Sequence, residues 1–331
     1  MRANQVRQLR QQYGWTQAEL AKRAGVSRQL VGAVEAGRNL PRVDAALALA
    51  NALGVDTATL FQPHQPAEDV LTGGPPTDGS LLRACLVGER MVTAAARAEM
   101  AGWDVADAEI ENGRLHPFAP LRPGVALAGC EPGLELLERW LREAGMGALA
   151  VSCSSTAALV AMAAGRLHGA VVHAPERNLP APPDGLPVTR FGMCRWRVGL
   201  AAPAEARPGW PDAALAGRTR VIQREPGAGV QAAFARAAGQ DVEGPLVGGH
   251  LEAARLAQAS GLPAVTIEPA ALAVGAAFHP LETHAAELWV ANQWLGEPAV
   301  GAALNELAGQ RFQRRMAAVG GYDLAGCGVA A

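Results

Sequence analysis

Apolar residues recur at helical spacing through the first sixty positions of this chain. Between residues 16 and 37 they form one stripe made up of Leu20, Ala21, Val26, Leu30 and Val34. A stripe with this period predicts amphipathic helices, here two short ones that pack on each other. The polar positions between them face outward in this interpretation.

Capping residues set the expected limits of the two helices. Thr16 with Glu19 three positions later predicts a capping box at the start of a helix over residues 17–24. Gly25 is expected to end that helix, because glycine takes the left-handed conformation without a Cβ penalty. Ser27 then predicts the start of a second helix, from residue 28 to about 36, with Gly37 just beyond it.

The order of these features resembles the Cro/CI-type (XRE) helix-turn-helix family. The resemblance is carried by Gln17, by Ala-Gly-Val-Ser at residues 24–27 and by the segment Glu-Ala-Gly-Arg-Asn-Leu-Pro at residues 35–41. It extends over about residues 6–61, with a first helix before the motif and closing helices after it. It implies an all-α DNA-binding domain over residues 1–62.

In such a domain the second helix of the motif enters the major groove of DNA. Its first residues reach base edges, so Ser27, Arg28 and Gln29 are the expected base contacts. Arg28 suits guanine and Gln29 suits adenine in bidentate pairs. Gln17 and Arg38 are expected to hold phosphates, which sets register. One such module buries little surface, so a homodimer on double-stranded operator DNA is expected.

The charge distribution agrees with this interpretation. Residues 1–62 hold eight Lys or Arg against three Asp or Glu besides Asp56, whereas the whole chain is near neutral at −2. Arg10 and Glu35 carry opposite charges on helices that should pack together. In the family such a pair is structural, and the same role is expected here.

The rest of the chain allows at least one further domain. It has 331 residues, half of them hydrophobic, which is far more core than a DNA-binding module needs. It shows neither an apolar run long enough to span a membrane nor a signal-peptide pattern, so a cytoplasmic protein without membrane contact is expected. Its five cysteines are then expected to be reduced.

Two segments lead from the first domain to the next. Residues 63–80 are rich in Pro, Gly and Asp and are predicted to be a linker. Residues 81–122 begin with a strand-like run at 81–87 and contain an Asn112-Gly113 turn typical of a hairpin. They are predicted to be a β-containing connector.

From residue 123 to 331 apolar runs alternate with helical patterns, which predicts an α/β domain. Parallel strands are expected at 125–128, 148–151 and 169–172, with helices at 134–143 and 157–164 between them. A second series has strands at 220–222 and 264–267 and helices up to 238 and over 251–260. Strands at 196–201, 278–281 and 288–291 and a terminal helix over 301–316 complete the pattern.

Several strings in this region resemble the substrate-binding-protein-like domain of molybdate-responsive bacterial regulators. They are Ala-Gly-Cys-Glu-Pro at 128–132, Arg-Glu-Pro-Gly-Ala-Gly-Val-Gln at 224–231, Gly-His-Leu-Glu-Ala-Ala at 249–254 and Phe-His-Pro-Leu-Glu-Thr-His at 278–284. The resemblance implies the two-lobed fold of type II periplasmic binding proteins. It also implies a small-molecule effector, in the first place molybdate or tungstate, and no other cofactor.

The expected ligand residues follow the strands, where helices begin. Helix N-termini carry free N–H groups and partial positive charge, so they bind oxyanions. Hydroxyls would add donors, Arg224 would add a fixed charge, and the glycines beside it allow close approach of the backbone. The expected set is Cys130, Glu131, Ser154, Ser155, Thr156, His173, Arg224, Gly227, Gly229 and His250.

The chain departs from the family pattern at several of these positions. Glu131 replaces an Asp, Ser155-Thr156 replaces Gly-Leu, and Val230-Gln231 replaces oxyanion donors, so an organic anion is an alternative ligand. Cys130 with Cys153 leaves open a soft-metal or redox sensor, although no Cys-x-x-Cys is present and no metal is expected. Catalytic motifs such as Gly-x-Ser-x-Gly or His-Glu-x-x-His are absent from the sequence, and an enzyme is not expected.

Overall fold

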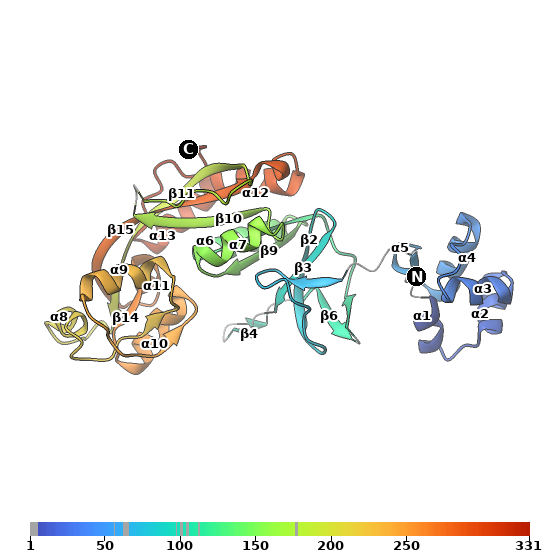
Figure 1. Ribbon diagram of the computed structural model, residues 1–331, viewed down its shortest axis with the longest axis horizontal. Helices are drawn as coiled ribbons and strands as arrows, with labels where there is room; N and C mark the ends of the chain where they lie inside the picture. Colours follow the sequence, from blue (N-terminus) through green and yellow to red (C-terminus); the bar gives the residue numbers. More distant parts are fainter. Residues whose placement is uncertain are drawn as a thin grey trace. The chain divides into compact units, whose positions relative to one another are not determined.

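The computed structural model describes residues 6–55, 57–61, 66–96, 98–99, 102–103, 106–111, 113–175 and 178–331. The chain divides into two units between Gln65 and Pro66. The first unit is helical, as expected, and the second is an α/β domain (Figure 1). The helices of the first unit are α1 (Val6–Gln12), α2 (Gln17–Ala24), α3 (Arg28–Glu35), α4 (Val43–Leu53) and α5 (Thr57–Phe61).

The predicted caps of α2 and α3 are present. Thr16 Oγ1 accepts a hydrogen bond from the Glu19 backbone N–H, and Glu19 accepts one from the Thr16 N–H at 2.6 Å, which completes the capping box. Gly25 ends α2 with φ +64°. Ser27 Oγ accepts from the Leu30 N–H at the start of α3. The caps therefore fix the turn that orients α3.

The core of the first unit differs slightly from the predicted stripe. Leu20, Ala21 and Val34 are buried as expected, but Val26 and Leu30 are only partly buried. Val31 is fully buried instead, because α3 also packs against α1. The buried face of α3 is therefore rotated about the helix axis from the face that the predicted stripe would bury.

The second unit begins with a small sheet in the strand order β1-β3-β2-β6-β7. Its strands are β1 (Ala67–Asp69), β2 (Leu81–Val87), β3 (Arg90–Ala95), β6 (Ala108–Glu111) and β7 (Arg114–Pro117), and β4 (Ala98–Glu99) pairs separately with β5 (Gly102–Trp103). The predicted hairpin is present, since Glu111 pairs with Arg114. Asn112 lies outside the described residues.

The segment predicted to be a linker over 63–80 belongs to the second unit from Pro66 onward. Ala67–Asp69 pairs in parallel with β3, and Val70 is fully buried against Cys85 and Val92. The strand β1 and the buried Val70 thus outweigh the Pro- and Gly-rich composition of the segment. Residues 62–65 lie outside the described residues.

The small sheet shares its core and ion pairs with the rest of the second unit. The buried Arg83 side chain on β2 donates to both carboxylate oxygens of Glu138, at 2.8 and 2.7 Å. Asp107 accepts two hydrogen bonds from Arg142, at 2.9 and 2.8 Å. The segment predicted as a connector is therefore packed firmly on the domain that follows it.

A larger sheet in the order β14-β11-β15-β10-β8-β9 organises the second unit. The predicted parallel strands β8 (Gly124–Gly129), β9 (Gly147–Ser152) and β10 (Gly169–Pro175) are confirmed. With helices α6 (Gly133–Glu143), α7 (Ser155–Ala163), α12 (Pro298–Ala308) and α13 (Gln310–Val319) they form what we call lobe I.

Lobe II consists of shorter strands and the helices around them. Its elements are α8 (Trp210–Leu215), β12 (Gln223–Arg224), α9 (Gly229–Ala238), β13 (Leu246–Val247), α10 (His250–Ser260), β14 (Ala264–Ile267) and α11 (Glu268–Ala273). The strand predicted at 220–222 is displaced, since only Ile222 makes an isolated bridge and the pairing begins at Gln223.

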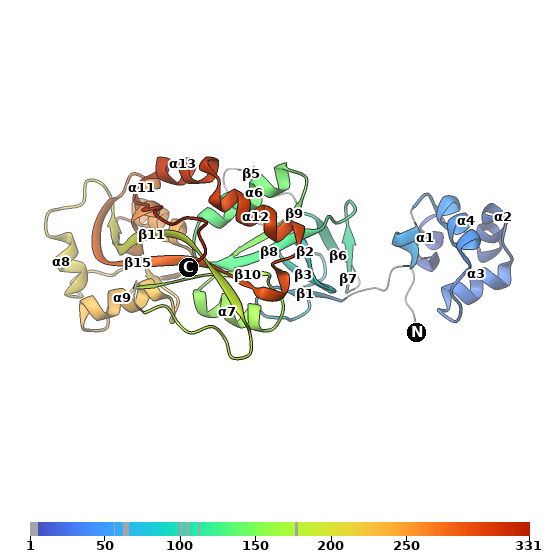
Figure 2. The same cartoon turned by 90° about the horizontal axis from the view of Figure 1, so that it is seen from above.

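Two long antiparallel strands, β11 (Val188–Ala202) and β15 (Ala277–Ala291), run from one lobe to the other (Figure 2). The two strands predicted at 278–281 and 288–291 are therefore one, because the polar residues between them still pair with β11. Conversely, the helix predicted over 301–316 is two helices. Gly309 separates α12 from α13 with an extended backbone.

The two-lobed α/β architecture is the predicted fold class. The short 3-10 helix η1 (Asn292–Trp294) connects β15 to α12. Among the described residues, no helix combines the length and the apolar character needed to cross a membrane.

Candidate functional site

The N-terminus of α3 presents the polar residues expected to read DNA. Ser27, Arg28 and Gln29 are all exposed, as is Arg38 beyond the helix. Arg28 and Gln29 occupy the first two helical positions, where side chains point away from the body of the unit. The Ser27 hydroxyl is engaged as the cap of α3, so its oxygen already accepts one hydrogen bond.

Gln17, which is expected to hold a phosphate, makes a contact within the first unit. Its Nε2 donates to Glu35 Oε2 at 2.8 Å, and Arg10 Nε donates to Glu35 Oε1 at 2.6 Å. The expected Arg10–Glu35 pair is therefore present and includes Gln17. These contacts tie α1, α2 and α3 together, so Gln17 orients α3.

In the second unit, the N-termini of α7, α9 and α10 meet around His173 at the end of β10. The His173 N–H donates to Ser155 Oγ in α7 at 3.2 Å. A Cβ at Gly229, the first residue of α9, would lie 2.9 Å from His173 Cε1. The Trp196 ring packs on both His173 and His250, with centroids 4.8 and 6.2 Å apart, and His250 is the first residue of α10.

Two of these helices begin without a side-chain cap. Ala228 and Gly249 are the N-cap residues of α9 and α10, and neither has a side-chain acceptor. The N-terminal N–H groups of helices with 10 and 11 residues therefore keep their partial positive charge at this junction. Ser154, in contrast, caps α7 by accepting from the Ala157 N–H at 3.2 Å.

Arg224, which is expected to add a fixed charge to the ligand site, contacts His250 there. It is almost fully buried, and it donates to the Val247 and Gly248 carbonyls at 3.2 and 2.7 Å and to Glu225 at 3.1 Å. Its Nη1 also donates to His250 Nδ1 at 2.8 Å. The donors of Arg224 are thus occupied within its own lobe.

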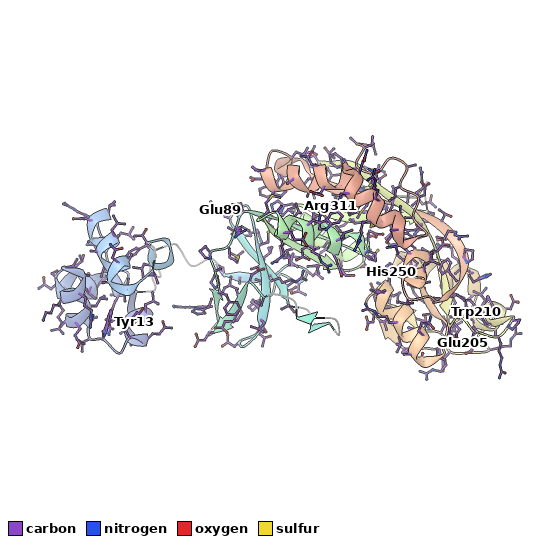
Figure 3. All side chains as sticks on the ribbon, turned by 180° about the vertical axis from the view of Figure 1, so that it is seen from behind. Tyr13, Glu89, Glu205, Trp210, His250 and Arg311 are labelled. Carbon is purple, nitrogen blue, oxygen red and sulfur yellow. The ribbon has the colours of Figure 1, made fainter. Side chains whose placement is uncertain are left out.

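The bond from Arg224 determines the protonation of His250. Because an Arg only donates, His250 Nδ1 must accept, and the ring proton lies on Nε2. His250 is 3% exposed, and its Nε2 has no hydrogen-bond partner among the described residues. Burial lowers the pKa of His250 well below its usual value, which keeps the ring neutral. An unpartnered buried N–H is costly, which favours a ligand acceptor here. Figure 3 labels His250 on the side of lobe II nearer lobe I.

His173 belongs to a second chain of contacts that the sequence did not predict. Its Nδ1 lies 2.9 Å from His284 Nδ1, and His284 Nε2 lies 2.6 Å from Glu282 Oε1. Arg236 also donates to Glu282 at 2.6 Å. Burial lowers the pKa of His173 to about 3 and also lowers that of His284.

Glu131 faces the core and not the junction. Its carboxylate accepts hydrogen bonds from Trp196 Nε1 at 2.7 Å, from the Tyr322 hydroxyl at 2.8 Å and from the Gly133 N–H at 2.9 Å. Burial raises its pKa. Glu131 therefore connects the loop before α6 to β11 and to the C-terminal segment, and we assign it a structural position.

Cys130 and Cys153 are free, buried thiols on neighbouring strand ends. Burial raises the pKa of Cys130, and raises that of Cys153 to about 12, whereas reactive cysteines need a low pKa. Across the described residues, no group of three or more His, Cys, Asp or Glu side chains is arranged to hold a metal ion.

Two of the remaining expected residues lie at the edge of the junction. Thr156 is exposed on the first turn of α7. Gly227 is also exposed, with φ +92° in the turn before α9, a conformation that favours glycine. The junction therefore contains Ser155, His173, Gly229 and His250 from the expected set, with Arg224 behind His250.

Trp196, Glu282 and His284 are residues of the junction that were not in the expected set. Glu282 and His284 are two positions apart on β15 and so point to the same face, which the sequence pattern could have indicated. Trp196 had no such signal, because an apolar strand residue is ordinarily part of the core.

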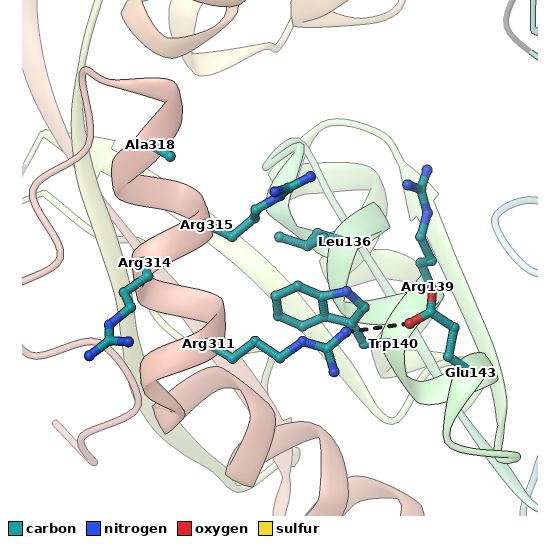
Figure 4. Close-up of a pocket in the computed structure, with 8 residues that line it drawn as sticks. All are labelled: Leu136, Arg139, Trp140, Glu143, Arg311, Arg314, Arg315 and Ala318. Carbon is teal, nitrogen blue, oxygen red and sulfur yellow. Dashed lines mark hydrogen bonds and ion pairs between the residues drawn. The ribbon is translucent and has the colours of Figure 1, made fainter.

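A separate groove of about 700 Å³ lies between α6 and α13 and contains none of the expected ligand residues (Figure 4). Arg139, Arg311, Arg314 and Arg315 line it, together with Trp140 and Glu143. The Arg311 guanidinium lies 3.9 Å from the centre of the Trp140 ring and 3.4 Å from Glu143. The groove is strongly basic but has an ion pair across it.

Comparison with known proteins gives matches in both units. A helix-turn-helix family model matches residues 6–60, and a model of the PBP superfamily domain matches residues 135–308. The HTH-type transcriptional regulator SutR of Escherichia coli (strain K12) is 37% identical over 62 residues, which are 19% of this chain and 35% of that protein. The chain thus spans about a third of the length of the curated relative it matches.

Solved structures similar to the second unit are distant in sequence. A putative phosphate ABC transporter substrate-binding protein with bound phosphate from Clostridium perfringens has 12% identity and a TM-score of 0.45, over 58% of this chain and 97% of that one. The tungstate ABC transporter from Geobacter sulfurreducens has 13% identity and a TM-score of 0.41, over 59% and 97%. Because the PBP model spans more than half of its residues, the chain belongs to the PBP superfamily, and it joins that domain to an XRE-type helix-turn-helix domain.

Proposed function

We propose that this protein is a cytoplasmic transcription regulator that binds operator DNA through α3 and senses a small oxyanion in its second unit. The observation that carries the ligand assignment is the buried, unpartnered Nε2–H of His250 beside two uncapped helix N-termini. The DNA assignment is supported by the exposed Arg28 and Gln29 at the start of α3. We do not propose a catalytic step.

The DNA half of the proposal treats α3 as the recognition helix of one half-site. Arg28 pairs with guanine and Gln29 with adenine, while Arg38 contacts a phosphate. A single unit of this size buries too little surface for tight binding, so we propose a homodimer on two half-sites about one helical turn apart.

We expect Arg28→Ala to lose discrimination at one base pair of the operator. A bidentate Arg–guanine contact contributes about 1–3 kcal/mol of specificity, which is roughly 5- to 150-fold in affinity. The measurement is selection of operators from a random DNA pool with the wild type and the variant, followed by binding titrations. An unchanged sequence preference would contradict the assignment of α3.

Arg38→Ala is the matched control for this experiment, because it removes one exposed guanidinium from the same unit. A phosphate contact carries no sequence information, so the variant should weaken binding to all sequences equally. It should also reduce the slope of log K against log salt by about 1.

The ligand half of the proposal rests on donors without a protein acceptor. The free N–H groups at the starts of α9 and α10 and the His250 Nε2–H would all donate to an oxyanion, which explains why the burial of His250 is tolerated. Molybdate and tungstate are the oxyanions that the family resemblance implies. An organic acid whose carboxylate takes the same donors is the alternative.

We expect Gly229→Ala to abolish oxyanion binding, because the new Cβ would lie 2.9 Å from His173 Cε1 at the start of α9. Thermal-shift measurements of the full chain would compare molybdate, tungstate, phosphate, sulfate and organic acids. A ligand at 100 times its Kd should add about 2.7 kcal/mol of stability to the wild type and nothing to this variant.

Gly301→Ala is the matched control, since Gly301 lies in α12 with no atom within 4 Å of an added Cβ. Alanine there should raise stability by up to about 1 kcal/mol without changing ligand binding. If no anion in the panel stabilises the wild type, the sensor half of the proposal is wrong. If Gly229→Ala keeps full binding, the site lies elsewhere.

A further inference from the structure

The hydrogen bonds around His173 fix which of its nitrogens carries a proton. Glu282 bonds to His284 Nε2 at 2.6 Å and to Arg236 at 2.6 Å, so it is an ionised acceptor. Although burial opposes it, the contacts with His284 and Arg236 lower the Glu282 pKa. His284 Nε2 must therefore donate to Glu282.

The remaining positions follow from the neutral state of both rings. A neutral His284 with its proton on Nε2 has a bare Nδ1. His173 Nδ1, 2.9 Å away, must then carry a proton and donate to it. The Nε2 of His173 is left without a proton and can only accept. Burial keeps this ring neutral, since its pKa is lowered to about 3.

The two imidazoles of the junction thus have opposite roles toward a ligand. His250 Nε2 is a donor because Arg224 donates to its Nδ1, and His173 Nε2 is an acceptor because of the chain through His284. Both rings pack on Trp196, and His173 contributes to lowering the pKa of His250, which places the two rings near each other.

Building on the proposed oxyanion site, we propose that its ligand is an oxyanion that still carries a proton, of the hydrogen phosphate or hydrogen arsenate class. The protonated oxygen donates to His173 Nε2, while an ionised oxygen accepts from His250 Nε2 and from the free N–H groups of α9 and α10. Sulfate, molybdate and tungstate carry no proton at neutral pH. Each would place an oxygen lone pair against the lone pair of His173 Nε2, and this acceptor would receive no hydrogen bond from the ligand.

The test compares anions that match in size and shape but differ in their proton. Calorimetric titrations of the full chain near neutral pH would use phosphate against sulfate, and arsenate against molybdate. We expect phosphate and arsenate to bind at least tenfold more tightly than sulfate and molybdate respectively. Equal or tighter binding of the unprotonated anions overturns this inference but leaves the proposed oxyanion sensor intact. If none of the four anions binds, this inference fails, and if the wider panel with tungstate and the organic acids gives no binding either, the sensor half of the proposed function fails with it.

A matched pair of variants separates the acceptor from general effects on the site. In His173→Gln the side-chain amide can rotate to donate or accept, so the preference for the protonated anion should fall below about threefold, mainly through tighter sulfate binding. In His250→Gln the amide still supplies a donor, so the preference should persist even if every affinity falls. An unchanged preference in His173→Gln contradicts the role of this residue as the acceptor. Melting temperatures without ligand would show that both variants fold.

Discussion

At the scale of single residues, the sequence predicted several residues of the candidate ligand site but not the contacts that each one makes. Arg224 and His250 follow strands of an α/β pattern, so both were expected at a ligand site. In the structure, the guanidinium of Arg224 donates hydrogen bonds to carbonyls of its own lobe and to His250 Nδ1. In the proposed ligand site, Arg224 would therefore act on a ligand through the proton on His250. Residue type and position could not reveal this, because the tautomer depends on contacts between elements far apart in the chain.

His168 allows a pH prediction at the same scale. It is buried, its Nδ1 accepts from the Ala126 N–H at 2.9 Å, and burial lowers its pKa to about 4. In the unfolded chain, His168 has the ordinary histidine pKa of about 6.5. At pH values between about 6.5 and 4 the unfolded chain therefore binds a proton at His168 and the folded protein does not. Stability from this group is fully present above about pH 6.5 and is lost as the pH falls toward 4.

His168→Asn should reduce that loss, because the Asn oxygen can still accept from Ala126 but does not titrate. Between about pH 7.5 and 5 the wild type should lose about 2 kcal/mol more stability than the variant. Urea unfolding followed by tryptophan fluorescence at both pH values measures this difference. Parallel pH profiles for the two proteins would show that His168 titrates normally in the fold.

At the scale of elements, local patterns succeeded where one face of a helix or strand is buried by its neighbours. The strands β8, β9 and β10 and the helices between them were predicted within three residues at each end, because each has its own apolar pattern in the sequence. The errors occur where contacts between segments far apart in the sequence determine the secondary structure. β15 continues through Glu282 and His284, since β11 pairs with it along its whole length.

Composition was a poor guide at the start of the second unit for the same reason. Pro- and Gly-rich residues 66–80 look like a linker, yet Val70 is buried with Cys85 and Val92, and Arg166 donates to the Val70 carbonyl at 3.0 Å. The Arg83–Glu138 pair fixes the small sheet to α6 in the same way. A short buried segment held by partners nearly 100 residues away leaves no periodic pattern in the sequence.

At the scale of the whole molecule, the proposed function divides between the two units, with DNA binding in the first and ligand sensing in the second. The XRE-type domain and the PBP domain each have their own core. β11 and β15 run through both lobes of the sensor, and the proposed ligand contacts both, through His173 of lobe I and His250 of lobe II. A bound anion would therefore hold the lobes in one arrangement, and the ligand can shift DNA affinity only by its differential affinity for the two arrangements.

This coupling makes a reciprocal prediction for the full chain. If a saturating oxyanion changes the operator Kd by a certain factor, saturating operator DNA must change the oxyanion Kd by the same factor, which for regulators is typically about 5- to 150-fold. Fluorescence anisotropy would give the first factor and calorimetry with and without DNA the second. Gly229→Ala should lose the effect of the anion on DNA while keeping the operator affinity of the unliganded wild type, because α3 lies in the other unit. An operator Kd that is the same with and without a tightly bound anion would mean that the second unit binds its ligand without controlling the first.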